Sequence, residues 1–226
     1  ILASEILETG ALAMADYEYH IFVSYRRMDE DWVRWTRENF VRPLRSLLRP
    51  ALGDVRIFLD EQIETGASWP ARLAAAHARA RLLVPILSRD YFNSDWCRLE
   101  LALMCERERM LGFRTPAKPQ VLILPFIIDD GDCFPLEVKA MQGEKIHDFA
   151  QPWMCTNTPK QEAFAEHLRR WCPRVEQALE CVPPIDPSWE RLTQDQFDQM
   201  FRVKAEKLNT LPGLSLLPNS QGPLSS

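Results

Sequence analysis

The side chains best suited to chemistry follow three β-rich runs of the sequence. They are Ser24, Tyr25, Arg26 and Arg27 after the first run, Asp60, Glu61 and Glu64 after the second, and Ser88, Arg89, Trp96 and Glu100 after the third. Arginines, carboxylates and an aromatic ring on one rim could bind an anionic ligand with planar rings, such as a nucleotide. The same residues could equally form a solvated loop surface.

Within the third group, Trp96 and Glu100 stand four residues apart in a segment with helical periodicity. Such a pair lies on one face of a helix about one turn apart, so the carboxylate and the ring can line one cleft. The alternative is an ordinary exposed glutamate, like Glu106 or Glu108 on the same predicted helix. In either case we expect Glu100 to face solvent without a partner, so that its replacement barely changes stability.

Strand and helix patterns alternate along the chain and would position these residues. The predicted strands are 20–25, 55–59, 82–87, 121–128 and a shorter one near 145–149, and the predicted helices are 29–48, 69–80, 95–111 and 160–180. The middle strands are apolar throughout, which is typical of strands buried on both faces. The pattern predicts an α/β fold, a flavodoxin-like five-stranded parallel sheet with helices on both faces. Ligands bind such sheets outside the carboxyl ends of the strands.

Capping residues and prolines refine these boundaries. Asp29 and Ser94 are suited to cap the first and third helices. Pro43 is expected to kink or end the first part of its helix, because it lacks an N–H and crowds the preceding turn. Pro85 and Pro125 fall inside predicted strands, where the missing N–H predicts a local irregularity.

A proline pair ends the predicted domain, which spans residues 17–182. An accessory segment, 183–211, follows it, and residues 193–196 have the pattern of a capping box that begins a further helix. This accessory C-terminal helix either docks on the core or serves an interface, and its stripe comprises Phe197, Met200, Phe201, Lys204 and Leu208. The remaining segments are expected to be an N-terminal extension, 1–16, and a disordered tail, 212–226.

The 226 residues carry a formal charge of −5, and 46% of them are hydrophobic, which is ordinary globular composition. The acidic balance argues against a protein that grips a nucleic-acid backbone. No apolar run approaches the ~20 residues that span a bilayer, so we expect no membrane segment. Six cysteines and four histidines are scattered without metal-ligand spacing, which predicts no metal site and favours the reducing cytoplasm.

Several common site motifs are absent from the sequence. It has no P-loop, no Gly-x-Gly-x-x-Gly fingerprint after a strand and no Gly-x-Ser-x-Gly elbow. A phosphoacceptor receiver domain shares the predicted topology, but it needs acidic residues after the first strand and an aspartate after the third. Those positions hold Tyr25, Arg26, Arg27 and Ser88, so the receiver interpretation fails.

Three segments together resemble a Toll/interleukin-1 receptor (TIR) domain, and the prokaryotic type and the animal NAD hydrolase of axon degeneration are the most similar. The segments are HIFVSYRR at 20–27, FLD at 58–60 with GASW at 66–69, and SDWCRLEL at 94–101. They occur in the family's order and spacing, and the resemblance covers about residues 17–180. The resemblance implies the same five-stranded flavodoxin-like sheet.

The TIR family divides in function. Some members are scaffolds that signal by TIR–TIR assembly, and others cleave the nicotinamide–ribose bond of NAD to nicotinamide and ADP-ribose or a cyclised isomer. Enzymatic members place a glutamate four residues after a tryptophan on the third helix, which implies that Glu100 is catalytic. The resemblance also implies contacts to NAD from Tyr25, Arg26, Arg27, Asp60, Trp69 and Trp96. Trp69 could instead be a core residue of its helix.

In this family a loop of a second subunit completes the active-site cleft, so the resemblance implies activation by self-association. The polar loop 61–68 is the element that could do this here, and the alignment of Glu61, Glu64 and Thr65 stays open because the loop lengths differ. Two alternatives also stay open. One is a scaffold that recruits partners through residues 60–69 without turnover, and the other is an effector activated in cis by another domain.

Cleavage of NAD suits a carboxylate. Breaking an N-glycosidic bond builds positive charge on the ribose, so a nearby negative group stabilises the transition state more than the ground state. A carboxylate can also hydrogen-bond the ribose hydroxyls and fix their orientation. Because nicotinamide leaves as a neutral molecule, the reaction needs no strong general acid. NAD is then the substrate, and we expect no cofactor.

Overall fold

The computed structural model describes residues 17–60, 69–129, 131–132 and 134–209, and its centre is a five-stranded sheet. The strands are β1 (Tyr19–Tyr25), β2 (Ile57–Leu59), β3 (Ala80–Leu87), β4 (Phe126–Ile127) and β5 (Glu144–Lys145). The helices are α2 (Glu30–Trp35), α3 (Arg42–Leu52), α4 (Trp69–Ala78), α5 (Asp95–Leu111), α6 (Leu136–Lys139), α7 (Pro159–Glu180) and α8 (Pro187–Asn209), with a π-helical segment at Thr36–Val41 and a 3-10 turn at Asp90–Asn93.

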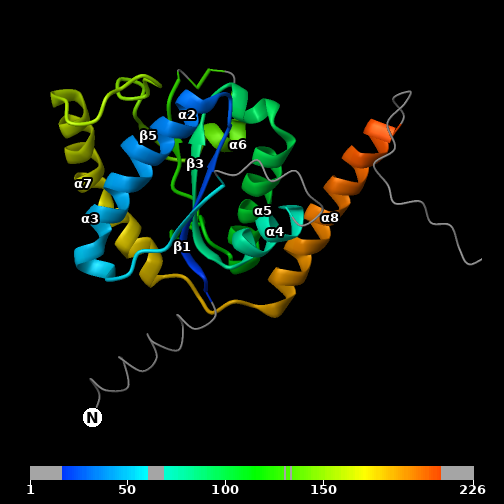
Figure 1. Ribbon diagram of the computed structural model, residues 1–226. Coiled ribbons are helices and arrows are strands. Elements are labelled where there is room, and N and C mark those ends of the chain that lie inside the picture. The colour runs from blue at the N-terminus through cyan, green and yellow to red at the C-terminus, as the bar shows by residue number, and fades with distance from the viewer. Residues whose placement is uncertain (1–16, 61–68, 130, 133, 210–226) are drawn as a thin grey trace, which may run out of the picture.

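The strand order is β2-β1-β3-β4-β5 with every pair parallel, which confirms the predicted flavodoxin-like sheet. β1 and β3 are almost entirely buried, and the apolar run 82–87 of β3 is typical of a strand covered on both faces. α3 and α7 pack together on one face, whereas α4, α5 and α8 cover the other (Figure 1). The carboxyl ends of β1 and β2 therefore meet at one edge, beside the beginnings of α4 and α5.

Pro85 interrupts the pairing between β3 and β4. β3 runs through Pro85 and keeps its pairing with β1. On the other side, Leu83 forms an isolated bridge with Ile123, and regular pairing resumes only at β4. Because the hydrogen-bonding side alternates along a parallel strand, position 85 faces the same neighbour as Leu83, and the proline has no N–H to donate there. The predicted strand 121–128 is therefore wrong in length.

The first predicted helix, 29–48, consists of three parts. Asp29 caps α2 as predicted, because its Oδ1 accepts a hydrogen bond from the Trp32 N–H at 3.0 Å. A π-helical segment follows, in which the Arg42 N–H bonds to the Arg37 carbonyl five residues earlier. This wider turn comes directly before Pro43, in the first turn of α3, so the predicted irregularity takes the form of a π-helical segment.

The C-terminal helix begins six residues earlier than the predicted capping box. Asp186 supplies the start of α8, since its Oδ1 accepts a hydrogen bond from the Ser188 N–H at 2.8 Å and Pro187 is the first helical residue. Thr193 lies inside the helix and is completely buried, so the capping-box prediction is wrong. The helix docks on the core through Trp189 and Phe197. Neither α8 nor any other helix among the described residues is long and apolar enough to cross a membrane.

The limits of the predicted domain stay a prediction. The predicted extension 1–16 and the predicted tail 212–226 both lie outside the described residues.

Candidate active site at the carboxyl edge of the sheet

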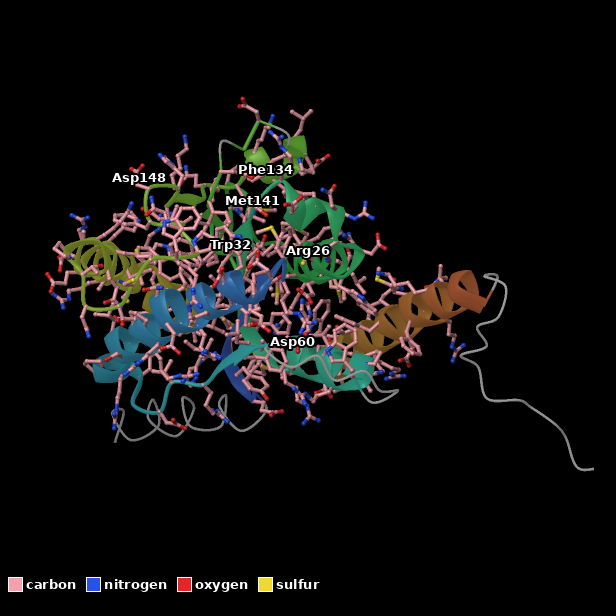
Figure 2. The ribbon with its side chains drawn as sticks, turned by 45° about the horizontal axis from the view of Figure 1, so that its top comes forward. Arg26, Trp32, Asp60, Phe134, Met141 and Asp148 are labelled. Carbon is pink, nitrogen blue, oxygen red and sulfur yellow. The ribbon has the colours of Figure 1, made fainter. Side chains whose placement is uncertain are left out.

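The ends of β1 and β2, the start of α4 and the first turns of α5 enclose a cavity of about 140 Å³. Every residue predicted for catalysis or NAD contact lines it, namely Tyr25, Arg26, Arg27, Asp60, Trp69, Trp96 and Glu100. Figure 2 turns this edge forward and labels Arg26 and Asp60, which lie near the middle of the molecule. Ser88 and Arg89 do not line the cavity, and Glu61, Glu64 and Thr65 lie outside the described residues.

A larger hollow of about 570 Å³ lies between the loop after α5 and the end of α7. None of the predicted site residues line it. Its two arginines already form ion pairs, Arg114 with Glu108 and Arg174 with Glu144. The smaller cavity is therefore the better candidate for chemistry.

Glu100 is buried rather than solvent-facing, which corrects the expectation from sequence. Only 6% of its surface is exposed, and its Oε2 accepts a hydrogen bond from the Ser24 hydroxyl at 2.5 Å. Glu108 is also buried, with an ion pair to Arg114, so it is not an ordinary exposed glutamate either. Of the three glutamates, only Glu106 fits that description, with its ion pair to Arg109 on the surface.

The hydrogen bond to Glu100 is part of a buried hydrogen-bond network. The hydroxyl oxygens of Ser24 and Tyr91 are 2.8 Å apart, and the Tyr91 hydroxyl, with one proton to donate to either neighbour, also lies 3.0 Å from the Cys97 carbonyl oxygen. Ser24 and Tyr91 are almost completely inaccessible to solvent. The sheet and α5 thus share one polar network whose outermost member is the Glu100 carboxyl group.

Burial raises the pKa of Glu100 to about 8. The Ser24 hydrogen bond and the charge of Arg27 oppose this rise in pKa, whereas the negative charge of Asp60 adds to it. Among the described residues, no lysine or arginine forms an ion pair with Glu100. The acid is therefore largely protonated at neutral pH, and a cationic ligand beside it would favour the carboxylate.

The Cys97 thiol also lines the cavity, but burial raises its pKa to about 12, so it is not a thiolate nucleophile at neutral pH. In the part of the chain that the structure covers, no group of three His, Cys, Asp or Glu side chains could hold a metal ion. The chemistry that this cavity can supply is therefore that of a carboxyl group beside arginines and aromatic rings.

Asp60 contacts several of the residues at the rim of the cavity. Its Oδ2 accepts a hydrogen bond from the Trp69 indole N–H at 3.2 Å and lies 3.4 Å from the Arg27 guanidinium. The hydroxyl of Tyr25 donates to the Asp60 carbonyl at 3.3 Å. Trp69 meets Trp96 edge to face, with ring centres 4.9 Å apart. Trp69 thus packs against the core and also lines the cavity, while its predicted contact with NAD stays a prediction.

Residues 21–169, well over half of the chain, match the family model described as TIR domain. The chain belongs to the TIR domain family. Two curated relatives and one solved structure are similar to parts of this chain. The TIR sequence is 27% identical over 154 residues to Probable disease resistance protein RPP1 of Arabidopsis thaliana, a match that covers 68% of this chain and 11% of that protein.

A second relative is Probable 2' cyclic ADP-D-ribose synthase BdTIR of Brachypodium distachyon. It is 28% identical over 129 residues, which cover 56% of this chain and 54% of that protein. The chain thus spans between about a tenth and about half of these curated relatives. The crystal structure of the TIR domain of the Toll-related receptor TRR-2 of Hydra magnipapillata is 15% identical, with a TM-score of 0.42, and covers 69% of this chain and 98% of that one.

Sequence reasoning missed Cys97, which lines the cavity, and two residues that contact its lining, Tyr91 and His77. His77 of α4 is completely buried, and its Nε2 lies 2.9 Å from the backbone carbonyl oxygen of Glu100. Burial lowers the pKa of His77 to about 4, so the ring is neutral. Because a carbonyl oxygen only accepts hydrogen bonds, Nε2 carries the proton and fixes the turn of α5 that bears Glu100. A single histidine in an alanine-rich helix gives no signal of such a partner.

Proposed function

We propose that this TIR domain cleaves the nicotinamide–ribose bond of NAD⁺, giving nicotinamide and ADP-ribose or a cyclic isomer. The observation that carries the proposal is Glu100: a carboxyl group buried beside Trp96 at the edge of the sheet, without an ion pair among the described residues. Such a group costs stability, and a pure scaffold does not need it. The Brachypodium relative is named a probable 2' cyclic ADP-D-ribose synthase, which supports the same reaction class.

The proposed reaction needs a carboxylate more than an acid. As the bond from C1′ of the ribose to the ring nitrogen breaks, its electron pair neutralises the pyridinium ring, and positive charge develops on the ribose. The Glu100 carboxylate stabilises that charge. Water then attacks C1′ and releases a proton, or a hydroxyl group of the substrate attacks instead and gives a cyclic isomer.

Substrate binding itself would ionise Glu100. The pyridinium ring carries a positive charge, and a cation near a buried carboxyl group lowers its pKa. Trp96 offers an aromatic surface for that ring, through stacking and cation–π attraction. Arg26 is exposed at the rim, where its guanidinium could contact the diphosphate. The site would then match a ligand with a cationic ring at one end and anionic groups farther along.

We also propose that assembly with other TIR domains completes the site. The cavity of about 140 Å³ is smaller than the roughly 300–1,000 Å³ of most small-molecule sites. A neighbouring TIR domain that adds a wall over the rim would enclose the rest of the dinucleotide. The scaffold function is the alternative, because a domain that only assembles needs no larger cavity.

The experiment that separates the two functions is incubation of concentrated protein with a fluorescent etheno-NAD analogue. A steady rise in fluorescence as the nicotinamide is released supports the enzyme. No release at any protein concentration, under conditions in which the domain assembles, would favour the scaffold.

A further inference from the structure

The helix α8 lies outside residues 21–169, the part of the chain that matches the TIR family model. It packs beside α4 and α5 on one face of the sheet, and its far end extends away from the body of the molecule (Figure 1). Trp189, Thr193 and Phe197 form its buried side at intervals of four residues. Lys204 continues toward the candidate active site, where its ammonium group meets Trp96.

Two residues of α8 hold the indole of Trp96. The ring of Phe197 stacks on it, with centres 6.0 Å apart and planes 18° from parallel. The Lys204 ammonium lies 5.1 Å from the centre of the same indole and 3.2 Å from Oδ2 of Asp95, the residue before Trp96. Trp69 contacts the indole edge to face from α4. The orientation of the aromatic wall beside Glu100 thus depends on α8 as well as on α4.

The same helix also reaches the backbone of Glu100 through His77. The ring centres of Phe197 and His77 are 6.0 Å apart, and those of Trp189 and His77 are 6.3 Å apart. The His77 ring in turn holds the Glu100 carbonyl oxygen. One side chain of α8, Phe197, therefore contacts both the aromatic wall of the cavity and the residue that fixes the acid-bearing turn.

A helix that only covered the core would not need all of these contacts. Apolar side chains such as Trp189 suffice to cover the alanine face of α4. They do not require an ammonium group above Trp96 with an ion pair to its neighbour, Asp95. An amine on the ring and a carboxylate beside it restrict both the position and the tilt of the indole. These contacts indicate a positioning role rather than burial alone.

We propose that α8 is part of the active site of this protein: Phe197 and Lys204 are positioning residues that fix Trp96 for the nicotinamide ring of NAD⁺. The proposal rests on the proposed NAD cleavage. A fixed indole contributes to substrate binding in the ground state and in the transition state alike, so losing it raises KM more than it lowers kcat. Residues outside the family-matched segment thus set the substrate affinity of this TIR domain.

The test uses the full chain labelled with ¹⁵N-tryptophan and three variants. Phe197→Leu removes the aromatic ring but keeps an apolar side chain, and Lys204→Met removes the charge but keeps the stem. Phe201→Leu is the matched control, because Phe201 is 39% exposed on the same helix. The indole N–H resonance of Trp96, assigned with Trp96→Phe, reports its position without requiring turnover, and etheno-NAD cleavage gives KM and kcat.

We expect Phe197→Leu and Lys204→Met to move the Trp96 resonance and to raise KM about three- to tenfold, with kcat changed less than about twofold. Phe201→Leu should change neither the Trp96 resonance nor KM. An unmoved Trp96 resonance with an unchanged KM in both test variants overturns the proposal, as does an equal change in the control. If the unmodified protein does not cleave NAD, the proposed function fails, and the Trp96 resonance in Lys204→Met, a change that removes no aromatic ring, still decides whether α8 positions the indole.

Discussion

The Ser24 hydroxyl and the Glu100 carboxyl group lie 2.5 Å apart at the carboxyl end of β1, and both are buried. This contact joins the centre of the sheet to the helix that bears the proposed catalytic acid. The Ser24 hydrogen bond also lowers the pKa of Glu100, although burial, the larger effect, still raises that pKa to about 8.

The first prediction concerns the pH dependence of NAD cleavage. Since the pKa of Glu100 is raised to about 8 by burial, kcat/KM should increase from pH 6 to pH 9 with a midpoint near that value. The midpoint for kcat should lie lower, because the bound pyridinium ring favours the carboxylate. Initial rates of etheno-NAD cleavage over this range provide the measurement. A kcat/KM that is flat over this range would be inconsistent with a buried carboxyl group as the essential ionising residue.

A second prediction concerns the donor to Glu100. Ser24→Ala removes a hydrogen bond that lowers the pKa of Glu100, so the midpoint of kcat/KM should move to higher pH and the rate at pH 7 should fall. The same pH series on the variant checks this. Thr36→Val is a suitable control, since it removes a buried hydroxyl that does not line the cavity. Equal midpoints in Ser24→Ala and the unmodified protein would mean that the short contact has no effect on ionisation.

The third prediction concerns stability. The folded protein keeps the Glu100 proton up to a pKa of about 8, whereas the unfolded chain releases it near 4.5. The folded state therefore binds more protons between these values, and its stability falls as pH rises through them. Glutamine does not ionise, so Glu100→Gln lacks this loss of stability. We therefore expect the variant to become increasingly more stable than the unmodified protein from pH 5 to pH 8.

Urea unfolding at several pH values measures that difference. Its size is roughly 1.4 kcal/mol for each unit by which the folded and unfolded pKa values differ. Glu106→Gln changes a surface residue on the same helix, and its free energy of unfolding should not rise with pH relative to the unmodified protein. A constant difference between Glu100→Gln and the unmodified protein at every pH would show that Glu100 is ionised in the folded state throughout.

A fourth prediction concerns assembly. If a neighbouring TIR domain completes the small cavity, activity per mole of protein should rise steeply with protein concentration or with a crowding agent. Rates measured from nanomolar to high micromolar protein test this. Rates strictly proportional to concentration over the whole range would mean that a single domain carries the complete site.

Much of this arrangement could be predicted from sequence, because its signals are local. The apolar runs at 82–87 and 121–128, together with the alternation of strands and helices, predicted a parallel sheet, and its carboxyl edge is where the residues predicted for catalysis and NAD contact meet. The four-residue spacing of Trp96 and Glu100 was enough to place them on one side of α5, since helical geometry fixes that relationship.

The features that sequence reasoning missed depend on contacts between distant segments. The burial of Glu100 requires Ser24 and Tyr91, which come from other elements. His77 reaches Glu100 only because α4 and α5 pack together. The predicted start of α8 was wrong because residues 193–196 match the capping-box pattern, whereas Asp186 accepts the hydrogen bond at the actual start of the helix. No local pattern carries information of this kind.

The most direct test of the central claim is the rate of NAD cleavage by Glu100→Gln, with Glu106→Gln as the control on the same helix. Glutamine keeps the size of the side chain and can accept the Ser24 hydrogen bond, but it carries no negative charge. We predict a loss of about a hundredfold or more in kcat for Glu100→Gln and an unchanged rate for Glu106→Gln. A Glu100→Gln protein that cleaves NAD as fast as the unmodified chain would contradict the assignment of Glu100 as the catalytic residue.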